Sequence, residues 1–179
     1  MLLRKKEEIE AWLNKYDIQN YEFIRNEIYG YVINVNGNVK LYNKQLKSIQ
    51  VKFNEINGNF DCSSNQLKTL EGSPEIVNGS FFCSNNQFIS LKGCSKAIKK
   101  NFNCSDNQLK TLEYCLKVMR NFFCENNELT IGGLNDLTKE VIISYIDISN
   151  NPELGDLQNI NDFNVLKEKL EEIFKIKDE

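Results

Sequence analysis

A repeat with a period of 21 residues constrains this chain more than any other feature. The segment at 60–70 reads Phe-Asp-Cys-Ser-Ser-Asn-Gln-Leu-Lys-Thr-Leu, and it recurs almost unchanged one and two periods later. A unit this short cannot bury its own apolar residues, so stacked copies predict a solenoid in which each unit packs on its neighbours. Counting a copy that begins one residue early and two degenerate ones, the six units begin at Val39, Phe60, Phe81, Phe102, Phe122 and Ile146.

Each unit predicts one short strand followed by a turn. Apolar residues at positions 1 and 3 alternate with polar ones, which is typical of a strand with one buried face. The asparagine at position 6 lies where the chain turns, and its amide can satisfy backbone groups there. Because 21 residues cannot also hold a long helix, we expect an extended or 3₁₀ return segment. The predicted fold class is mainly β, a parallel β-sheet solenoid.

The pattern Phe-x-Cys-x-x-Asn-x-Leu-x-x-Leu resembles the leucine-rich repeat, with Phe and Cys at two of its leucine positions. The sequence of residues 58–74 and the lead-in at 20–24, followed by 32–41, also look like repeats common in tailed-phage and prophage proteins. The resemblance covers about 20–157 and departs from the pattern at Lys44, which replaces the asparagine, and at Gly132-Gly133, which breaks the phase. It implies a leucine-rich-repeat-like architecture and a phage origin.

The ends of a stack of strands must be covered. Residues 2–16 and 162–175 place apolar side chains at helical spacing, the second with Asn161 or Asp162 as its N-cap, so we predict a capping helix at each end. The alternative is that one of them is an interaction helix. Asn36-Gly37, between 29–35 and 39–42, is typical of a hairpin turn. The chain is thus divided into a helix at 1–19, a lead-in hairpin at 20–38, the solenoid at 39–157 and a helix at 158–179.

The amino-acid composition limits the reactions and ligands that this chain can support. Among 179 residues there is no histidine, which excludes imidazole as a base or metal ligand, and the net charge of −3 argues against general binding to nucleic acid. Charges at 4–8 interrupt any signal sequence, and the apolar stretch at 141–146 is too short to span a bilayer. We therefore expect no membrane association and a cytoplasmic location, in the bacterial host if the chain is phage-encoded, with the six cysteines as thiols.

The cysteines fall into columns, which invites a zinc site. With strands about 4.8 Å apart, the outer cysteines of one column would lie about 14 Å apart. A zinc ion needs all four sulfurs at about 2.3 Å from the metal, so the column cannot bind one. We predict buried thiols, no metal and no cofactor. Outward carboxylates such as Asp61 and Asp147 lie too far apart to act as a pair, so we expect no enzyme. The columns are Cys62, Cys83, Cys104 and Cys124, and a second begun by Cys94 and Cys115.

The outward residues of the strands form the first candidate surface. Phe82 and Phe123 would lie two strands apart, about 10 Å, on an otherwise polar face. Aromatic anchors among small polar groups are typical of a protein-binding patch. The alternative is that a loop or terminus covers them. The predicted partner-binding residues are Lys40, Tyr42, Asp61, Phe82, Asn103, Phe123, Glu125, Tyr145 and Asp147.

A basic edge is the second candidate surface. The period aligns Lys96 with Lys117 and Lys99 with Arg120, so these residues and Lys100 would stack on one edge. Such an edge could bind RNA or an acidic protein patch, or could simply be solvated. Aromatic residues that would mark a platform for nucleic-acid bases are not interleaved with it.

These observations predict a non-catalytic, monomeric protein-binding module. The phage resemblance makes it an inhibitor that sterically blocks a host defence protein, for example an anti-CRISPR bound to a host nuclease complex. Three alternatives remain open at this point. They are an RNA or ribonucleoprotein binder that uses the basic edge at 96–120, a phage structural component, and an enzyme whose turnover depends on one carboxylate or thiol.

Overall fold

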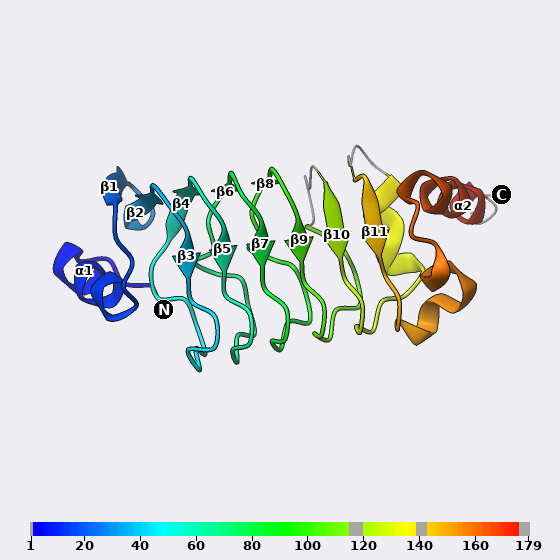
Figure 1. Cartoon of the computed structure of the whole chain (residues 1–179), viewed down its shortest axis with the longest axis horizontal. Coiled ribbons are helices and arrows are strands. Elements are labelled where there is room, and N and C mark those ends of the chain that lie inside the picture. The colour runs from blue at the N-terminus through cyan, green and yellow to red at the C-terminus, as the bar shows by residue number, and fades with distance from the viewer. Residues whose placement is uncertain (1, 115–119, 139–142, 176–179) are drawn as a thin grey trace.

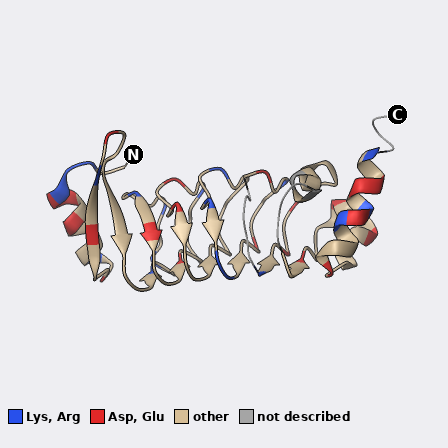
Figure 2. Cartoon of the chain, turned by 90° about the horizontal axis from the view of Figure 1, so that it is seen from above, with Lys and Arg blue, Asp and Glu red and all other residues tan. Residues whose placement is uncertain are grey.

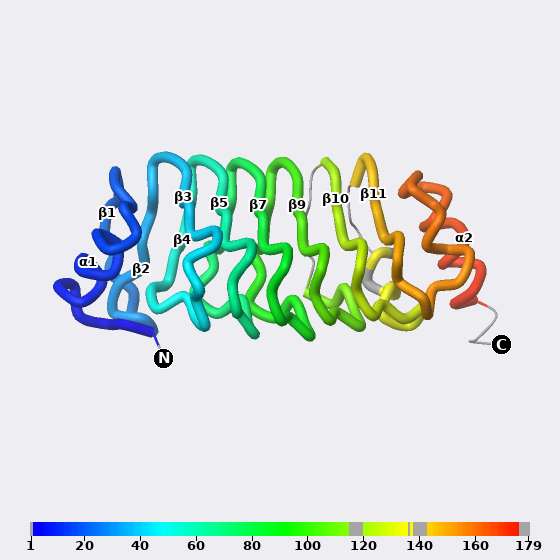
Figure 3. Tube along the Cα trace, turned by 60° about the horizontal axis from the view of Figure 1, so that its bottom comes forward, coloured from blue at the N-terminus to red at the C-terminus, as the bar shows by residue number. Residues whose placement is uncertain are grey.

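The computed structural model describes residues 2–114, 120–138 and 143–175. They form a parallel β-solenoid, an elongated rod with helix α1 (Lys6–Lys15) at one end and α2 (Phe163–Lys175) at the other (Figure 1). Successive turns of the chain lie side by side along the rod, as the colour gradient of the trace shows (Figure 3). The predicted fold class is therefore confirmed.

The predicted strands form a six-stranded parallel sheet, in the order β11-β10-β9-β7-β5-β3. The first positions of neighbouring units are aligned: Phe60 pairs with Phe81, and Phe81 pairs with Phe102. This alignment confirms that the units stack in register. The strands are β3 (Val39–Lys40), β5 (Phe60–Asp61), β7 (Phe81–Phe82), β9 (Phe102–Asn103), β10 (Asn121–Phe123) and β11 (Tyr145–Asp147).

The return segments build a second sheet that the sequence did not predict. Their extended conformation was expected, but the return segments of the first three units also form strands, β4, β6 and β8, which extend the β1-β2 pair in the order β1-β2-β4-β6-β8. All neighbours in this sheet are parallel except β1 and β2, which form an antiparallel hairpin. The strands are β1 (Tyr21–Asn26), β2 (Gly30–Val35), β4 (Phe53–Ile56), β6 (Ile76–Val77) and β8 (Ala97–Ile98).

The prediction of a hairpin turn at Asn36-Gly37 is wrong. The strands on either side of it, β2 and β3, belong to different sheets, and the real hairpin turns between Asn26 and Gly30. Asn36-Gly37 instead forms a corner of the solenoid. The equivalent glycine of the next turn, Gly58, packs so tightly that a Cβ there would overlap the carbonyl oxygen of Gly37, which explains why glycine recurs at this corner.

A ladder of phenylalanine rings runs through the core. The ring centroids of Phe60 and Phe81 are 5.1 Å apart, those of Phe81 and Phe102 are 5.4 Å apart, and those of Phe102 and Phe122 are 5.4 Å apart. Burial of one such ring contributes about 1.5–3 kcal/mol. The cysteines two residues further along each strand point inward as predicted, and none of them is exposed: Cys62, Cys83, Cys104 and Cys124.

A second ladder consists of asparagines at the turns. The Asn86 Oδ1 accepts the backbone N–H of Leu67 in the preceding turn at 3.0 Å. The Asn86 Nδ2 donates to the carbonyl oxygens of Cys62 and Cys83, at 3.0 and 3.2 Å. The amide thus joins two turns through backbone groups that the bend leaves unpaired, which confirms the predicted structural role. The same pattern is made by Asn65, Asn107, Asn127 and Asn151.

The two helices cover the ends of the rod. Helix α1 buries Ile9, Trp12 and Leu13, and the Trp12 ring lies 6.3 Å from the Phe53 ring of β4. Helix α2 buries Phe163, Leu166 and Leu170. Its N-cap is Asp162, one of the two predicted residues, because the Asp162 Oδ1 accepts the backbone N–H groups of Asn164 and Val165. Two 3₁₀ segments, η1 (Gly132–Thr138) and η2 (Pro152–Asn159), precede α2.

Candidate protein-binding face

The outward residues of the six-stranded sheet form a single column, which we call the outward face. Strand register places Phe82 between Asp61 and Asn103, and Phe123 between Asn103 and Asp147. The two phenylalanines are therefore two strands apart, as predicted. Both remain half-buried, so no described segment covers them completely. The column consists of Lys40, Asp61, Phe82, Asn103, Phe123 and Asp147.

The polar members of this column close the turn that follows each strand. The Asp61 Oδ1 accepts the N–H of Ser63, the Asn103 Oδ1 accepts that of Ser105, and the Asp147 Oδ1 accepts that of Ser149, each at 3.0 Å. A phenylalanine cannot accept such a bond. Phe82 and Phe123 therefore occupy positions where neighbouring turns use a side chain that stabilises the fold, so their presence is not explained by the turn itself.

Three further aromatic or acidic side chains flank the column. The Tyr145 ring lies 5.8 Å from the Phe123 ring, centroid to centroid, so the two aromatics of β10 and β11 are in contact. Tyr42 is 55% exposed and lies just beyond β3, at the other end of the sheet. Glu125 follows Phe123 by two residues, and its Oε2 is buried without a hydrogen-bond partner among the described residues. The predicted residues thus gather on one face, most densely on β10 and β11.

The basic edge is smaller than the sequence predicted. Lys99 and Lys100 are exposed at the corner after β8, and Arg120 is exposed before β10. Lys117 lies outside the described residues. Lys96 is also exposed, but its Nζ lies 2.7 Å from the Glu75 Oε2, so its charge is already paired. Charged residues are densest on α1 and α2, and they also occur at turns and corners along the solenoid, whereas most strand residues are uncharged (Figure 2).

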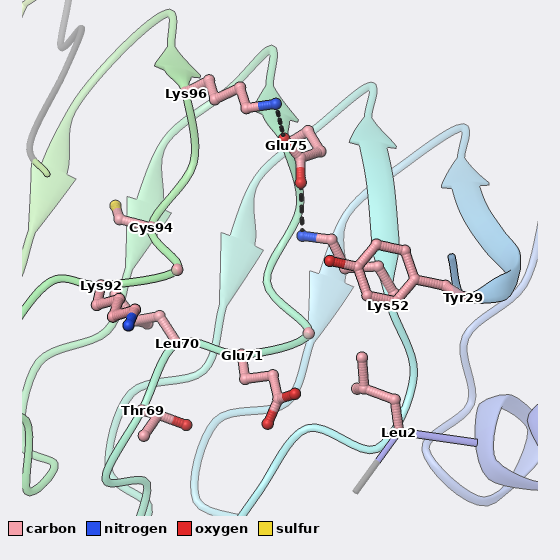
Figure 4. A pocket seen from close by; sticks show the side chains of 12 residues that line it. Leu2, Tyr29, Lys52, Thr69, Leu70, Glu71, Glu75, Lys92, Cys94 and Lys96 are labelled. Atoms are coloured by element: carbon pink, nitrogen blue, oxygen red, sulfur yellow. Dashed lines mark ion pairs between the residues drawn. The ribbon is translucent and has the colours of Figure 1, made fainter. Parts of the chain in front are cut away.

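The ion pair of Lys96 belongs to a chain of three charges. The other oxygen of Glu75, Oε1, lies 2.9 Å from the Nζ of Lys52, a lysine with only 8% of its surface exposed (Figure 4). Lys52 also donates to the carbonyl oxygen of Ser73 at 2.7 Å. The sequence could have indicated one of these pairs, because Glu75 and Lys96 are one period apart.

This ion-pair chain shifts the pKa of Glu75 and that of Lys96. Partial burial acts to raise the pKa of Glu75, but the hydrogen bonds from Lys96 and Lys52 outweigh it, and the pKa lies below its ordinary value. The hydrogen bond to Glu75 raises the pKa of Lys96. Glu75 and Lys96 are therefore both charged at neutral pH. With Lys52, they line a cavity of about 540 Å³ whose other charged residues are Glu71 and Lys92, so positive and negative groups nearly balance there.

Two of the described cysteines are poor nucleophiles. Burial raises the pKa of the Cys62 thiol well above its ordinary value, and burial raises the pKa of Cys94 to about 12. A thiol must lose its proton to attack or to bind a metal, so these two are unreactive at neutral pH. Cys115 lies outside the described residues. Within the described ranges, no group of three or more acidic, cysteine or histidine side chains is arranged to hold a metal ion.

The fold and this face together define a parallel β-solenoid with an exposed, partly aromatic sheet surface. Comparison of the chain with models of protein families, with curated proteins and with solved structures finds no match. Among the helices of the described residues, none has the length and apolar character needed to cross a membrane.

Proposed function

We propose that this chain is a non-catalytic protein-binding module whose outward face docks on a larger protein. One observation carries the proposal: two of the six strands place a phenylalanine where neighbouring turns use Asp or Asn to accept a turn hydrogen bond. The two turns give up a stabilising bond and expose an aromatic ring instead. The exchange removes a turn hydrogen bond, and it supplies the kind of anchor that dominates protein interfaces.

The rigidity of the solenoid supports a steric mechanism. The asparagine and phenylalanine ladders fix the backbone behind the outward face, so little conformational entropy is lost when a partner docks. Flanking positions of the face hold small polar residues that permit close approach, including Ser63 and Ser84. The bound module then covers a surface of its partner and excludes other molecules from it.

The style of the repeat supports a more specific role. The units resemble leucine-rich repeats of the type common in tailed-phage and prophage proteins, and a small stand-alone binder of that origin fits an inhibitor of a host defence protein. We infer an anti-CRISPR-like monomer that acts in the bacterial cytoplasm on a host nuclease complex, without a cofactor.

The proposal is tested by capture from a bacterial lysate with tagged protein. The variant with Phe82→Ser and Phe123→Ser should lose its specific partner at least tenfold, because both anchors are removed. A matched control is Ile89→Ser, which removes an apolar side chain that is 65% exposed but lies outside the outward face. An unchanged partner list for the double variant, or an equal loss in the control, would refute the proposal.

The basic corner supports a second candidate, binding to RNA or to a ribonucleoprotein. Lys99, Lys100 and Arg120 are exposed, and no ion pair holds them within the part of the chain that the structure describes. RNA binding there would weaken steeply with salt and would be lost when all three are changed to Glu. Under the main proposal, the same triple variant keeps its protein partner.

A further inference from the structure

The strand register brings two aromatic residues and two acidic residues to the C-terminal end of the outward face. Phe123 of β10 lies in register with Asp147 of β11, and its ring contacts that of Tyr145, which precedes Asp147 by two residues. Glu125 follows Phe123 by two residues, so alternation along the chain places it on the same side. We call these four residues the aromatic-acidic cluster.

The composition of this cluster departs from that of the other turns. Position 4 of the unit is serine in four of the six copies, and Glu125 takes that place in the same turn in which Phe123 replaces Asp or Asn. In the next turn, Tyr145 stands where the preceding copies have Asn or Ser. Three departures from the repeat therefore coincide in space, although the repeat itself does not require any of them.

Glu125 has an acceptor that the fold leaves unused. Its backbone carbonyl oxygen accepts the N–H of Asp106 at 3.0 Å, but its side-chain Oε2 is buried and has no hydrogen-bond partner among the described residues. A buried acceptor without a donor is costly, and folded proteins rarely contain one without a reason. A donor supplied by a partner would remove this cost once the Glu125 side chain turns outward to meet it.

The cluster fits a cationic donor, and a guanidinium fits it better than an ammonium. An arginine side chain is planar, stacks on aromatic faces and presents several N–H groups to carboxylates. Phe123 and Tyr145 supply the rings, whereas Glu125 and Asp147 supply the negative charge. Lys40, the single cation of the outward column, lies on β3 at the opposite end of the sheet.

We propose that the aromatic-acidic cluster binds an arginine side chain on a basic surface of the partner protein. This inference rests on the proposed function, since it names the chemistry of the partner at one end of the same face. It also gives the docked complex an orientation, because the basic surface of the partner must lie over β10 and β11 and not over β3.

The first test uses N-acetyl-arginine amide as a probe of the isolated protein, followed by NMR with ¹⁵N labelling. We expect saturable shifts at the amides of Phe123 and Tyr145, with half-saturation in the millimolar range. The citrulline analogue has nearly the same shape without the charge and should cause no such shifts. The lysine analogue should bind at least threefold more weakly, because its ammonium cannot stack or form a planar pair of hydrogen bonds.

Two charge-removing variants locate the effect. Glu125→Gln should weaken binding of the arginine probe at least fivefold, whereas Asp61→Asn, which removes the same charge from a distant strand of the same face, should not. Thermal unfolding of both variants checks that they remain folded. Equal binding of citrulline, equal or tighter binding of lysine, or no difference between the two variants would overturn the inference.

Failure of this inference can be told apart from failure of the proposed function. If the Phe82 and Phe123 double variant loses its captured partner while the arginine probe causes no shifts, the face binds a partner through other chemistry. If the double variant keeps its partner, the proposed function itself fails, whatever the probe shows.

Discussion

The inward and outward sides of the same six strands follow different rules. Inward, the first position is always a large apolar residue, and four successive turns have cysteine two residues later. Outward, the column changes from Lys to Asp to Phe to Asn along the rod. An inward side chain contacts its equivalents in the turns before and after, so it can vary little. An outward side chain faces solvent, so its residue type can vary from turn to turn and can be adapted to function. The following predictions test how sharp that division is.

The largest effect is expected from truncating an inward ring. Phe81 and Phe82 are adjacent in β7, but Phe81 has no exposed surface and contacts the rings of Phe60 and Phe102. Phe81→Ala should lower the free energy of unfolding by about 3–5 kcal/mol, because it leaves a cavity in the ladder. Phe82→Ala should lower it by less than about 1 kcal/mol. Urea denaturation measures both, and similar losses would contradict the division.

The next largest effect is expected at the asparagine ladder. Asn86→Ala removes the partner of one backbone N–H and of three carbonyl oxygens, and we expect a loss of about 2–3 kcal/mol in the free energy of unfolding. Gln87→Ala is the matched control, since this exposed neighbour should change stability little. A harmless Asn86→Ala would show that the turns hold together without their side-chain amides.

A smaller effect is expected at the ion-pair chain. Glu75→Gln leaves the buried Lys52 without its carboxylate partner, which should lower the free energy of unfolding at neutral pH by about 1–2 kcal/mol. Lys96→Met is the control, because it keeps the pair of Glu75 with Lys52 and should matter less.

The same ion-pair chain predicts a pH dependence. The pKa of Glu75 is lowered in the folded protein, so its stabilisation is present above the ordinary value of 4.5 and is lost as pH falls through the lower folded value. The difference in stability between the wild type and Glu75→Gln should therefore shrink on acidification from pH 7. A constant difference from neutral to strongly acidic pH, measured by denaturation, would contradict this assignment.

The smallest effect is expected at the turn residue before each ladder asparagine. Ser64 has a φ of 53°, in the left-handed region, where the equivalent turns have Asn85, Asp106 and Asn126. Asparagine tolerates this region better than serine, so Ser64→Asn should raise the free energy of unfolding by less than about 1 kcal/mol. The melting temperature should rise slightly with it. The reverse change, Asn85→Ser, should lower it by a similar amount. Opposite signs would exclude backbone strain as the cause.

The sequence was informative wherever a property repeats with the period. The strand register, the inward cysteines and the structural asparagines all follow from one rule, that equivalent residues stack. Ordinary helix preferences limited the N-cap of α2 to Asn161 or Asp162, and the hydrogen bonds of the structure select Asp162. The position of Phe82 and Phe123 on one face also followed from the rule, because alternation in a short strand decides which side chain points outward.

Other features depended on contacts that a local pattern does not contain. Ile76-Val77 and Ala97-Ile98 each consist of two apolar residues, so they show no alternation of apolar and polar side chains, and the second sheet was missed. Asn36-Gly37 matches a hairpin turn locally, and only its recurrence at Asn57-Gly58 and Asn78-Gly79 marks a solenoid corner. The buried oxygen of Glu125 depends on side-chain packing, which no sequence pattern reveals.

In-register stacking also fixes the distances between side chains on the outward face. Two anchors on this sheet are separated by the number of turns between them, with one interval of about 4.8 Å for each turn. Duplication of one 21-residue unit between β9 and β10 would move Phe123 one interval further from Phe82 and leave every ladder intact. A gene that gains or loses whole units can therefore retune the span of its binding surface in fixed steps, without redesigning the core.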